Sequence, residues 1–363
     1  MNSSVRSYLP RLLLDWFAKS ASVERHNETA HQGILLFADA SGFTALTREL
    51  SRRGPIGNEL LTNLLNNMFT SLERAFSAYD GDILKFSGDA VWCYLPGEID
   101  IARCHAQILT AVDALNRSQS ICSEFPIGLH AGAELGDFCL ASVGNADSRL
   151  EFEIHGQLIH TVYEACDLAS NRQLALGPTL AAWVADSGTS LSSSGAFSLY
   201  EPLTETAGET LCEPRPRSEP DIDREDFALY VPITVRERLL NLADAAKLEN
   251  ELRKVTVLFA SLSPLPQTNE IGAGRATEAL QELCAAIFAS VREHGGSVAR
   301  LDPFKEGHKL LVLFGALSKS EGEKHTALKV AREITMLESD GFTVSVGLSS
   351  GHLFCGEVGS ESR

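Results

Sequence analysis

The chain carries two copies of one pattern of segments, and this repeat limits the possible folds more than any other feature. The paired segments share apolar residues and glycines. They are 33–39 with 255–261, 87–97 with 306–316, and 126–132 with 345–351. The three segments keep the same order and nearly the same separation in both copies. Three such matches in register indicate that one structural unit has been duplicated.

Residues 202–226 separate the two copies. They are rich in proline and charge and show no apolar period, which is typical of a linker. Residues 235–253 carry apolar side chains at helical spacing, which predicts a connecting helix that packs between the halves or, as the alternative, binds a partner. We therefore expect an N-terminal helical segment (1–30), a first domain (31–201), a linker (202–234) and a second domain (235–363).

Each copy is expected to contain the same order of elements: strand, helix, two strands joined by a tight turn, helix, strand. This is the βαββαβ order of ferredoxin-like domains, so the predicted fold class is α+β. The first copy would have strands 33–39, 81–86, 90–95 and 126–132, with helices 44–79 and 99–117. The second would have strands 255–261, 297–302, 309–314 and 343–350, with helices 276–294 and 323–337.

Composition excludes several classes of partner. The formal net charge of −17 would repel phosphate backbones and anionic lipid, so we expect no nucleic-acid partner. No apolar run reaches the roughly 18 residues of a spanning helix, so no membrane span is expected.

The eight cysteines form no Cys-x-x-Cys pair and the ten histidines lack metal-ligand spacing. This favours reduced thiols in a soluble cytoplasmic protein without a disulfide framework or a zinc site.

Two aspartates stand where predicted strands end. Asp39 follows the apolar run 34–38, and Asp89 lies in the tight turn of the predicted hairpin. If these strands are neighbours, both carboxylates emerge at one edge of the sheet, where they would repel unless a divalent cation joined them. A hard ion such as Mg²⁺ suits such oxygen ligands. Taken singly, each aspartate is equally typical of a turn or a helix cap.

A short turn leads from Asp39 into the next predicted helix. Backbone N–H groups without partners at a helix start are suited to phosphate oxygens. The groups in question belong to Ser41, Gly42, Phe43 and Thr44. Together with the aspartate pair, they predict a site for a metal-bound phosphate compound.

At these residues the sequence resembles the class III nucleotidyl cyclases, and among them the soluble, bicarbonate-responsive adenylyl cyclases. Segment 37–46 is similar to the first metal-binding segment of the family, and segment 81–90 to the second. The resemblance extends over residues 30–175 and 235–363. It implies two tandem cyclase domains that pack as a pseudo-dimer by intramolecular pairing, with the second domain incomplete.

The resemblance also implies roles for individual residues. Asp39, the Ala40 carbonyl and Asp89 would hold two Mg²⁺ ions, with Mn²⁺ as the alternative, and the two aspartates would be catalytic. The backbone amides of residues 41–44 would hold the triphosphate of ATP. Lys305 would contact the base, although it lies one position from the strict match; the alternative is an exposed turn lysine.

Lys85 matches the lysine of the family's bicarbonate site, whereas Tyr163 stands where the family has an arginine. Bicarbonate is therefore an expected effector through Lys85 alone. The alternative is a strand lysine whose amino group extends to solvent beside the hairpin.

The two halves are expected to contribute unequally. Ser261 and His308 stand at the positions of Asp39 and Asp89, so the second half would hold no metal. In the helix that carries the family's transition-state asparagine and arginine, the first half has His160 and Glu164. The chain ends before the second half's equivalent helix, and loss of such an arginine costs on the order of 10³-fold in rate.

The function implied is that of an adenylate cyclase, a phosphorus–oxygen lyase that converts ATP to cyclic AMP and pyrophosphate between its two domains. This chain by itself is expected to be weak or inactive. The alternative is a non-catalytic nucleotide-binding or dimerisation module that regulates a cyclase. Overall resemblance alone favours ATP over GTP.

Overall fold

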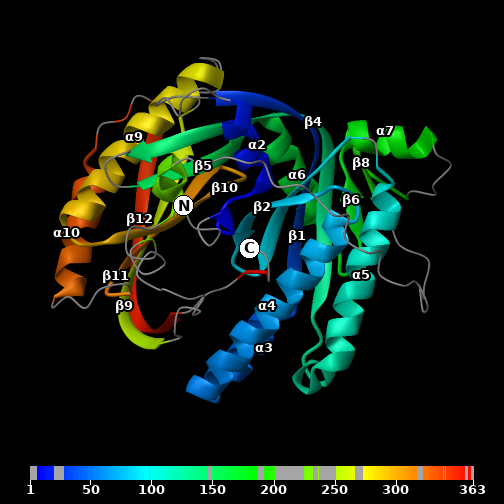
Figure 1. Cartoon of the computed structure of the whole chain (residues 1–363), viewed down its shortest axis with the longest axis horizontal. Coiled ribbons are helices and arrows are strands. Elements are labelled where there is room, and N and C mark those ends of the chain that lie inside the picture. Colours follow the sequence, from blue (N-terminus) through cyan, green and yellow to red (C-terminus); the bar gives the residue numbers. More distant parts are fainter. Residues whose placement is uncertain are drawn as a thin grey trace.

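Two β-sheets, each covered by helices, form the computed structural model of the chain (Figure 1). The larger sheet belongs to the first half of the sequence and the smaller one to the second half. The structure describes residues 6–19, 28–97, 99–145, 149–186, 192–200, 225–231, 236, 251–265, 273–316, 322–337, 339, 341–355 and 359–360.

The first sheet has the strand order β2-β3-β1-β4-β6-β8-β7, and β5 pairs with the far end of β4. The long antiparallel pair β1 and β4 forms its centre, with Asp39 opposite His130 in the register. The strands are β1 (Glu28–Ser41), β2 (Asp82–Ser87), β3 (Ala90–Leu95), β4 (Gly128–Asn145), β5 (Arg149–His155), β6 (Leu174–Leu176), β7 (Ser192–Ser194) and β8 (Phe197–Tyr200).

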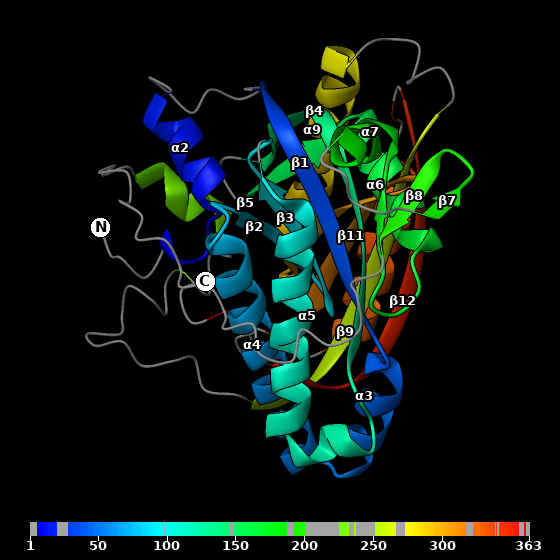
Figure 2. The same cartoon turned by 90° about the vertical axis from the view of Figure 1, so that its right-hand side faces the viewer.

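Helices cover both faces of this sheet. The helices are α2 (Arg11–Lys19), α3 (Phe43–Arg52), α4 (Pro55–Ser77), α5 (Ile101–Ser118), α6 (Gln157–Leu168) and α7 (Pro178–Asp186), with short 3-10 turns η1 (Ser120–Ser123) and η2 (Glu225–Tyr230). Leu36 of β1 belongs to the core beneath α4 and α5, whereas its neighbour Leu35 belongs to the core with α2 and α6. This alternation follows from the period of two along a strand, which sends successive side chains to opposite faces. Figure 2 shows α4 and α5 side by side along the sheet.

The single helix expected over 44–79 is instead two helices, α3 and α4. Gly54 separates them with a φ of 67°, and Pro55 follows as the first residue of α4. A left-handed residue cannot continue a helix, and proline favours the first helical position because it lacks the N–H that would be unpaired there. The Gly-Pro pair therefore breaks the helix that the apolar period alone predicts.

The second sheet has the order β10-β11-β9-β12. Its strands are β9 (Glu251–Pro264), β10 (Ser297–Phe304), β11 (Gly307–Phe314) and β12 (Phe342–Cys355), and its helices are α9 (Ala273–Glu293) and α10 (Glu323–Thr335). Leu258, Phe288 and Val312 belong to the core between this sheet and its helices. The strand and helix order agrees with the βαββαβ order expected for both halves.

Strand pairing confirms the first two of the three repeat matches and corrects the third. Ala38 lies opposite Val91, and their matches in the second copy, Ala260 and Leu310, also lie opposite each other.

The last strand of the second copy differs. Ala38 pairs with Ala131, whose match in the repeat is Ser350, but Ala260 pairs with Val346 instead. A register shift by an even number of residues keeps the same side chains on the same face of the sheet. The shift in this strand places Val346 against the core of the second half.

Several expected boundaries fall elsewhere. The first strand begins at Glu28, not at residue 33, and β9 begins at Glu251, so the expected connecting helix 235–253 is wrong over its last three residues. Most of the rest of that helix lies outside the described residues, as does most of the linker 202–234. None of the helices in the described ranges is long and apolar enough to cross a membrane.

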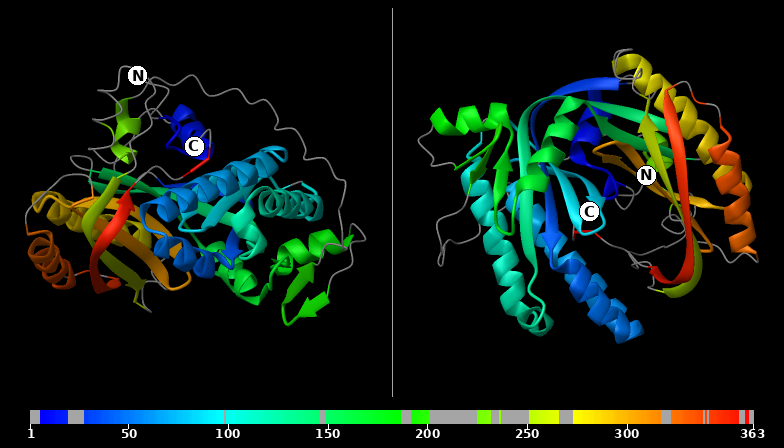
Figure 3. Two further views of the ribbon diagram at one scale, coloured as in Figure 1. Left: turned by 90° about the horizontal axis from the view of Figure 1, so that it is seen from below. Right: turned by 180° about the vertical axis from the view of Figure 1, so that it is seen from behind.

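The two halves meet where β4 and β5 extend beyond the rest of the first sheet and β4 lies against α9 (Figure 3). Val143 of β4 belongs to the apolar core of the second half. The Gln281 side chain of α9 accepts a hydrogen bond from the Gly144 N–H (2.7 Å) and donates one to its carbonyl (2.8 Å). Apolar packing and paired polar groups thus join the halves at the same place.

Candidate functional site

Asp39 and Asp89 lie at the same edge of the first sheet. β1 and β3 are direct neighbours, and their pairing ends at Ala38 and Val91, so Asp39 follows the last pair on β1 and Asp89 stands just before β3. Asp89 is in the turn between β2 and β3, where Gly88 adopts a φ of 76°. The strand arrangement on which the predicted metal site depends is therefore present.

Burial disfavours the charged forms of both carboxyls, and the charge of Asp89 also disfavours that of Asp39. Burial raises the pKa of Asp39, and the charge of Asp89 raises it further. His130 opposes this effect, with its Nε2 atom 3.9 Å from Oδ2 of Asp39. Burial also raises the pKa of Asp89, against the lowering effect of Arg300 from the second half. A divalent cation would relieve the repulsion, and carboxylate oxygens are the ligands that Mg²⁺ prefers.

The start of α3 follows directly from β1. Gly42 is its N-cap, with a φ of 83° and no side chain to cap the first N–H groups. A Cβ atom at Gly42 would lie 2.7 Å from the Pro126 carbonyl oxygen, so both conformation and space require glycine here. The Ser41 hydroxyl donates to Oδ1 of Asn171 at 3.2 Å. The first turn of α3 thus lacks a side-chain cap at the place where the sequence predicts phosphate binding.

Lys85 is buried between the halves and does not extend to solvent. Its Nζ atom lies 3.1 Å from Oε2 of Glu153 and donates a hydrogen bond to the carbonyl of Leu301. It also stands over the ring of Phe152, 4.6 Å from the centroid. The Lys85 and Glu153 side chains are only 6% and 0% exposed. These partners favour a structural role, and binding of bicarbonate by Lys85 stays a prediction.

His308 joins this buried cluster from the second half. Its Nε2 atom lies 3.4 Å from Oε1 of Glu153. Burial raises the pKa of Glu153 to about 8, although the nearby Lys85 ammonium lowers it. Burial, together with the charges of His155 and Lys85, lowers the pKa of His308 to about 3. His308 stands at the repeat position of Asp89, so in the second half a neutral imidazole replaces the predicted metal-binding carboxylate.

Three further contacts join the first half to strands β10 and β11. The Tyr163 hydroxyl donates to the Pro303 carbonyl at 2.7 Å, in the place where the family has an arginine. Arg300 donates to the Phe86 carbonyl at 3.3 Å. Lys305, in the turn between the two strands, pairs with Asp167 of α6 at 3.0 Å. Its amino group is thus held by α6, and its contact with a base stays a prediction.

The α6 helix contains the segment in which the family has its transition-state residues. His160 and Glu164 lie on its surface, 3.6 Å apart and about two-fifths exposed. A carboxylate there would repel anionic phosphate, so the arginine's role is not expected of these two residues.

Two residues near the site were not predicted from the sequence. Glu153 pairs with Lys85, and the charge of Arg300 lowers the pKa of Asp89. Glu153 lies in Leu150-Glu-Phe-Glu-Ile154, whose alternation indicates a strand with a charged face. Burial of that face became visible only in the fold, because β10 of the second half packs against β5.

Comparison with known proteins gives distant relatives of one kind. Adenylate cyclase type 10 of Mus musculus is 26% identical over 404 aligned positions, which cover 99% of this chain. The Homo sapiens protein of the same name is 25% identical over 389 positions and 94% of the chain. This chain spans only about a quarter of their length (24% and 23%). No protein-family model matches it.

Among solved structures, a class III adenylyl cyclase-like ATP-binding protein from Pseudomonas aeruginosa has a TM-score of 0.54. The two chains are 11% identical, and the match covers 97% of this chain and 84% of the other. The chain thus has the α+β fold of class III nucleotidyl cyclases and is distantly homologous to adenylate cyclase type 10 over nearly its whole length. This confirms the resemblance seen in the sequence.

Proposed function

We propose that the chain binds Mg–ATP at Asp39 and Asp89 and contributes to its conversion into cyclic AMP and pyrophosphate. The observation that carries this proposal is the pair of carboxyls at one sheet edge, where the charge of Asp89 raises the pKa of Asp39. Without a bridging cation, the repulsion between two carboxylates destabilises the folded state. A purely structural role therefore explains poorly why both aspartates stand at this edge.

The donor set at this edge fits Mg²⁺ and the related ion Mn²⁺. Asp39 and Asp89 supply carboxylate oxygens, and Ala40 supplies a backbone carbonyl from the last residues of β1. Mg²⁺ is bound by one or two protein carboxylates together with substrate phosphates. When bound, the metal would assist attack of the ribose 3′-hydroxyl on the α-phosphate and stabilise the charge of the leaving pyrophosphate.

The phosphates would lie against the start of α3. Its first N–H groups lack a side-chain cap, and they follow Asp39 by only a few residues. A helix N-terminus attracts anions through these N–H groups and through the helix dipole. The name of the Pseudomonas aeruginosa protein, an ATP-binding protein of the same fold, supports ATP as the ligand.

The two halves would act as a pseudo-dimer of cyclase domains, with the linker 202–234 between them. Support comes from the contacts of Tyr163 and Arg300 across the junction and from the matching registers of the central strands. Lys305 would read the base only after it leaves Asp167, since the two side chains are paired. That exchange is feasible because both side chains are substantially exposed, at 37% and 64%.

Calorimetric titration of the chain with ATP and Mg²⁺ tests the proposal. We expect binding that needs the metal and that weakens at least about tenfold in Asp39→Asn and Asp89→Asn. Asp137→Asn, at an exposed aspartate on β4, is the matched control and should bind like the wild type. Equal affinity of all four proteins would refute the assignment of Asp39 and Asp89.

The alternative is a non-catalytic nucleotide-binding module that regulates a cyclase. It is favoured by Glu164 and His160 on α6, which cannot replace an arginine at an anionic transition state. A cyclic-AMP assay on the same samples separates the two functions. Turnover that Asp39→Asn abolishes supports the enzyme, whereas Mg–ATP binding without turnover supports the regulatory module.

A further inference from the structure

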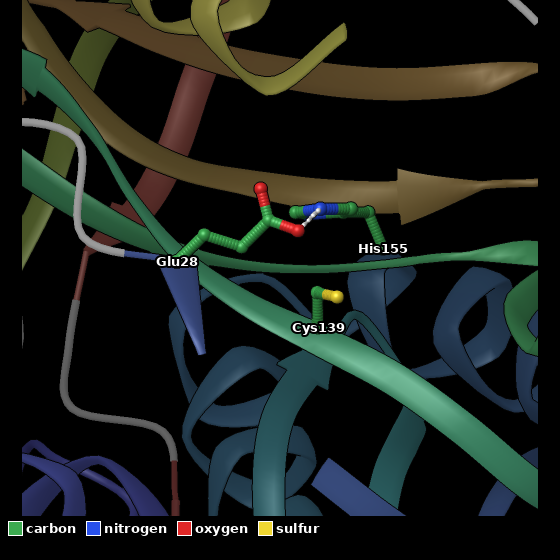
Figure 4. Close-up of side chains that lie close together, drawn as sticks. All are labelled: Glu28, Cys139 and His155. Atoms are coloured by element: carbon green, nitrogen blue, oxygen red, sulfur yellow. Dashed lines mark ion pairs between the residues drawn. The ribbon is translucent and has the colours of Figure 1, made fainter. Parts of the chain in front are cut away.

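Glu28, Cys139 and His155 form a second cluster of ligating side chains, at the other end of β1 from Asp39 (Figure 4). They come from three strands of the first sheet: the start of β1, the middle of β4 and the end of β5. Cys139 lies directly opposite His155 in one pairing and opposite Ala30 in the other. Glu28 is two residues before Ala30, so the register places all three side chains on one face.

The three ligand atoms are close to one another. Nε2 of His155 lies 3.4 Å from Oε1 of Glu28, and one ligand atom from each residue lies within 4.8 Å of the others. The Cys139 thiol is hydrogen-bonded to the Glu28 carboxylate. Figure 4 shows this carboxylate directed at the imidazole ring, with Cys139 beside them on β4. The three side chains are thus close enough to hold one metal ion.

The second half covers this cluster with α9. The Thr277 hydroxyl donates to Oε2 of Glu28 at 2.8 Å and lies 3.1 Å from Nε2 of His155. Thr277 is 7% exposed, and the side chains of His155 and Glu28 are 18% and 23% exposed. The cluster is therefore partly shielded yet reachable. Thr277 orients the Glu28 carboxylate through Oε2, as hydrogen-bonding partners of metal ligands do, and its contact with Nε2 of His155 would be exchanged for the metal.

The chemistry of these donors selects among metals. A thiolate, an imidazole and a carboxylate together suit Zn²⁺, whereas Mg²⁺ and Ca²⁺ prefer oxygen ligands alone. Deprotonation of Cys139 would give the cluster two negative charges, which a divalent ion balances. Burial and the neighbouring Glu28 raise the pKa of the Cys139 thiol to about 12, so a metal must displace that proton.

We propose that Glu28, Cys139 and His155 bind one Zn²⁺ ion at the junction of the two halves. Three protein ligands leave a fourth tetrahedral position for water or a small anion. The ion ties β1, β4 and β5 together beneath α9, and the site is independent of nucleotide binding at Asp39 and Asp89. Spacing along the chain indicated no zinc site, because these ligands are far apart in sequence and meet only through strand pairing.

Titration of the full chain with Co²⁺, a spectroscopic substitute for Zn²⁺, tests the site. We expect one equivalent to bind with visible tetrahedral d–d bands and a thiolate-to-metal charge-transfer band. Zn²⁺ should displace it and raise the melting temperature. Loss of a residue that orients a ligand costs roughly 10–100-fold in metal affinity, so Thr277→Val should cost about 10-fold and Cys139→Ser at least about 100-fold.

Matched variants make the test decisive. Cys212→Ser and Cys355→Ser should keep the thiolate band, whereas Cys139→Ser should abolish it. His155→Gln and Glu28→Gln retain the thiol and should each weaken Zn²⁺ binding, with circular dichroism confirming that they fold. Binding without a thiolate band, a band that survives Cys139→Ser, or unchanged Zn²⁺ affinity in folded His155→Gln would overturn the proposal and leave a hydrogen-bonded cluster only.

Discussion

Nζ of Lys85 lies 3.1 Å from Oε2 of Glu153, and this pair is buried where the two halves of the chain meet. Lys85 belongs to β2 and Glu153 to β5, and Lys85 also donates to the Leu301 carbonyl of the second half. One amino group therefore pairs with a carboxyl of its own half and donates a hydrogen bond to a backbone carbonyl of the other. The association of the two halves should therefore depend on the Lys85 side chain.

Substitution Lys85→Met should lower the free energy of unfolding by about 2–4 kcal/mol, because it leaves the Leu301 carbonyl without its donor and the buried Glu153 carboxyl without its ion-pair partner. Chemical denaturation followed by fluorescence measures the loss. Lys329→Met, on the exposed face of α10, serves as the control and should change stability by less than about 0.5 kcal/mol. A loss at Lys85 as small as the control's would show that solvent replaces the lysine.

Glu153 should make stability fall as pH rises. Burial raises its pKa in the folded chain to about 8, above the ordinary value of 4.5. The folded state therefore holds a proton that the unfolded state releases, so the contribution is complete below about pH 4.5 and is lost as pH rises through 8. Melting temperatures between pH 6.5 and 8.5 should decline in the wild type, with a flatter profile in Glu153→Gln.

His308 should make the stability of the fold decrease as pH falls, which is the opposite of the effect expected for Glu153. Burial lowers its folded pKa to about 3 from an ordinary 6.5, so its contribution is present above pH 6.5 and is lost as pH falls toward 3. His308→Phe should remove part of the acid destabilisation between these pH values. Denaturation at pH 4 and pH 7 measures it, and an identical pH dependence in both proteins would contradict burial of a neutral imidazole.

Gln281→Leu should cost about 2–5 kcal/mol. The amide of Gln281 bonds to both the N–H and the carbonyl of Gly144, and leucine leaves both buried groups unpaired. Glu282→Leu, on the exposed face of the same helix, is the matched control. We expect Gln281→Leu also to expose the β4–α9 junction to hydrogen exchange, and unchanged protection there would argue against the role given to this contact.

Asp39→Asn should stabilise the chain slightly at pH 7 with metal chelated. Burial and the charge of Asp89 raise the pKa of Asp39, so its ionisation above that pKa reduces folded stability. The gain should stay below about 1 kcal/mol, because the side chain is 38% exposed and solvent screens its charge. It should disappear at pH 3, where the carboxyl is protonated. Thermal melts at both pH values, with and without Mg²⁺, measure this; a less stable variant at pH 7 would mean that Asp39 is already paired.

Much of the fold could be predicted because it depends on local pattern. The runs that became β1, β3, β9 and β11 are strongly apolar, and the duplication placed Asp39 and Ser261 at equivalent points of their strands. The resemblance to class III nucleotidyl cyclases could be seen in the sequence because the motifs around Asp39 and Asp89 are contiguous. The slide of β12 was not predictable, since its alternation permits any even shift and only packing of Val346 against the core selects one.

The sequence by itself determined the two-part architecture, the order of strands and helices, and the resemblance to class III nucleotidyl cyclases, because each is encoded in residues that are neighbours along the chain. Tertiary structure alone decided which charged groups are buried and which share a site. Glu28 meets Cys139 and His155 through strand register within the first half. Lys85 meets Glu153 through the fold of the first half and meets Leu301 through docking of the second. Burial and pKa depend on neighbours from distant segments, so they exist only once the two halves have packed.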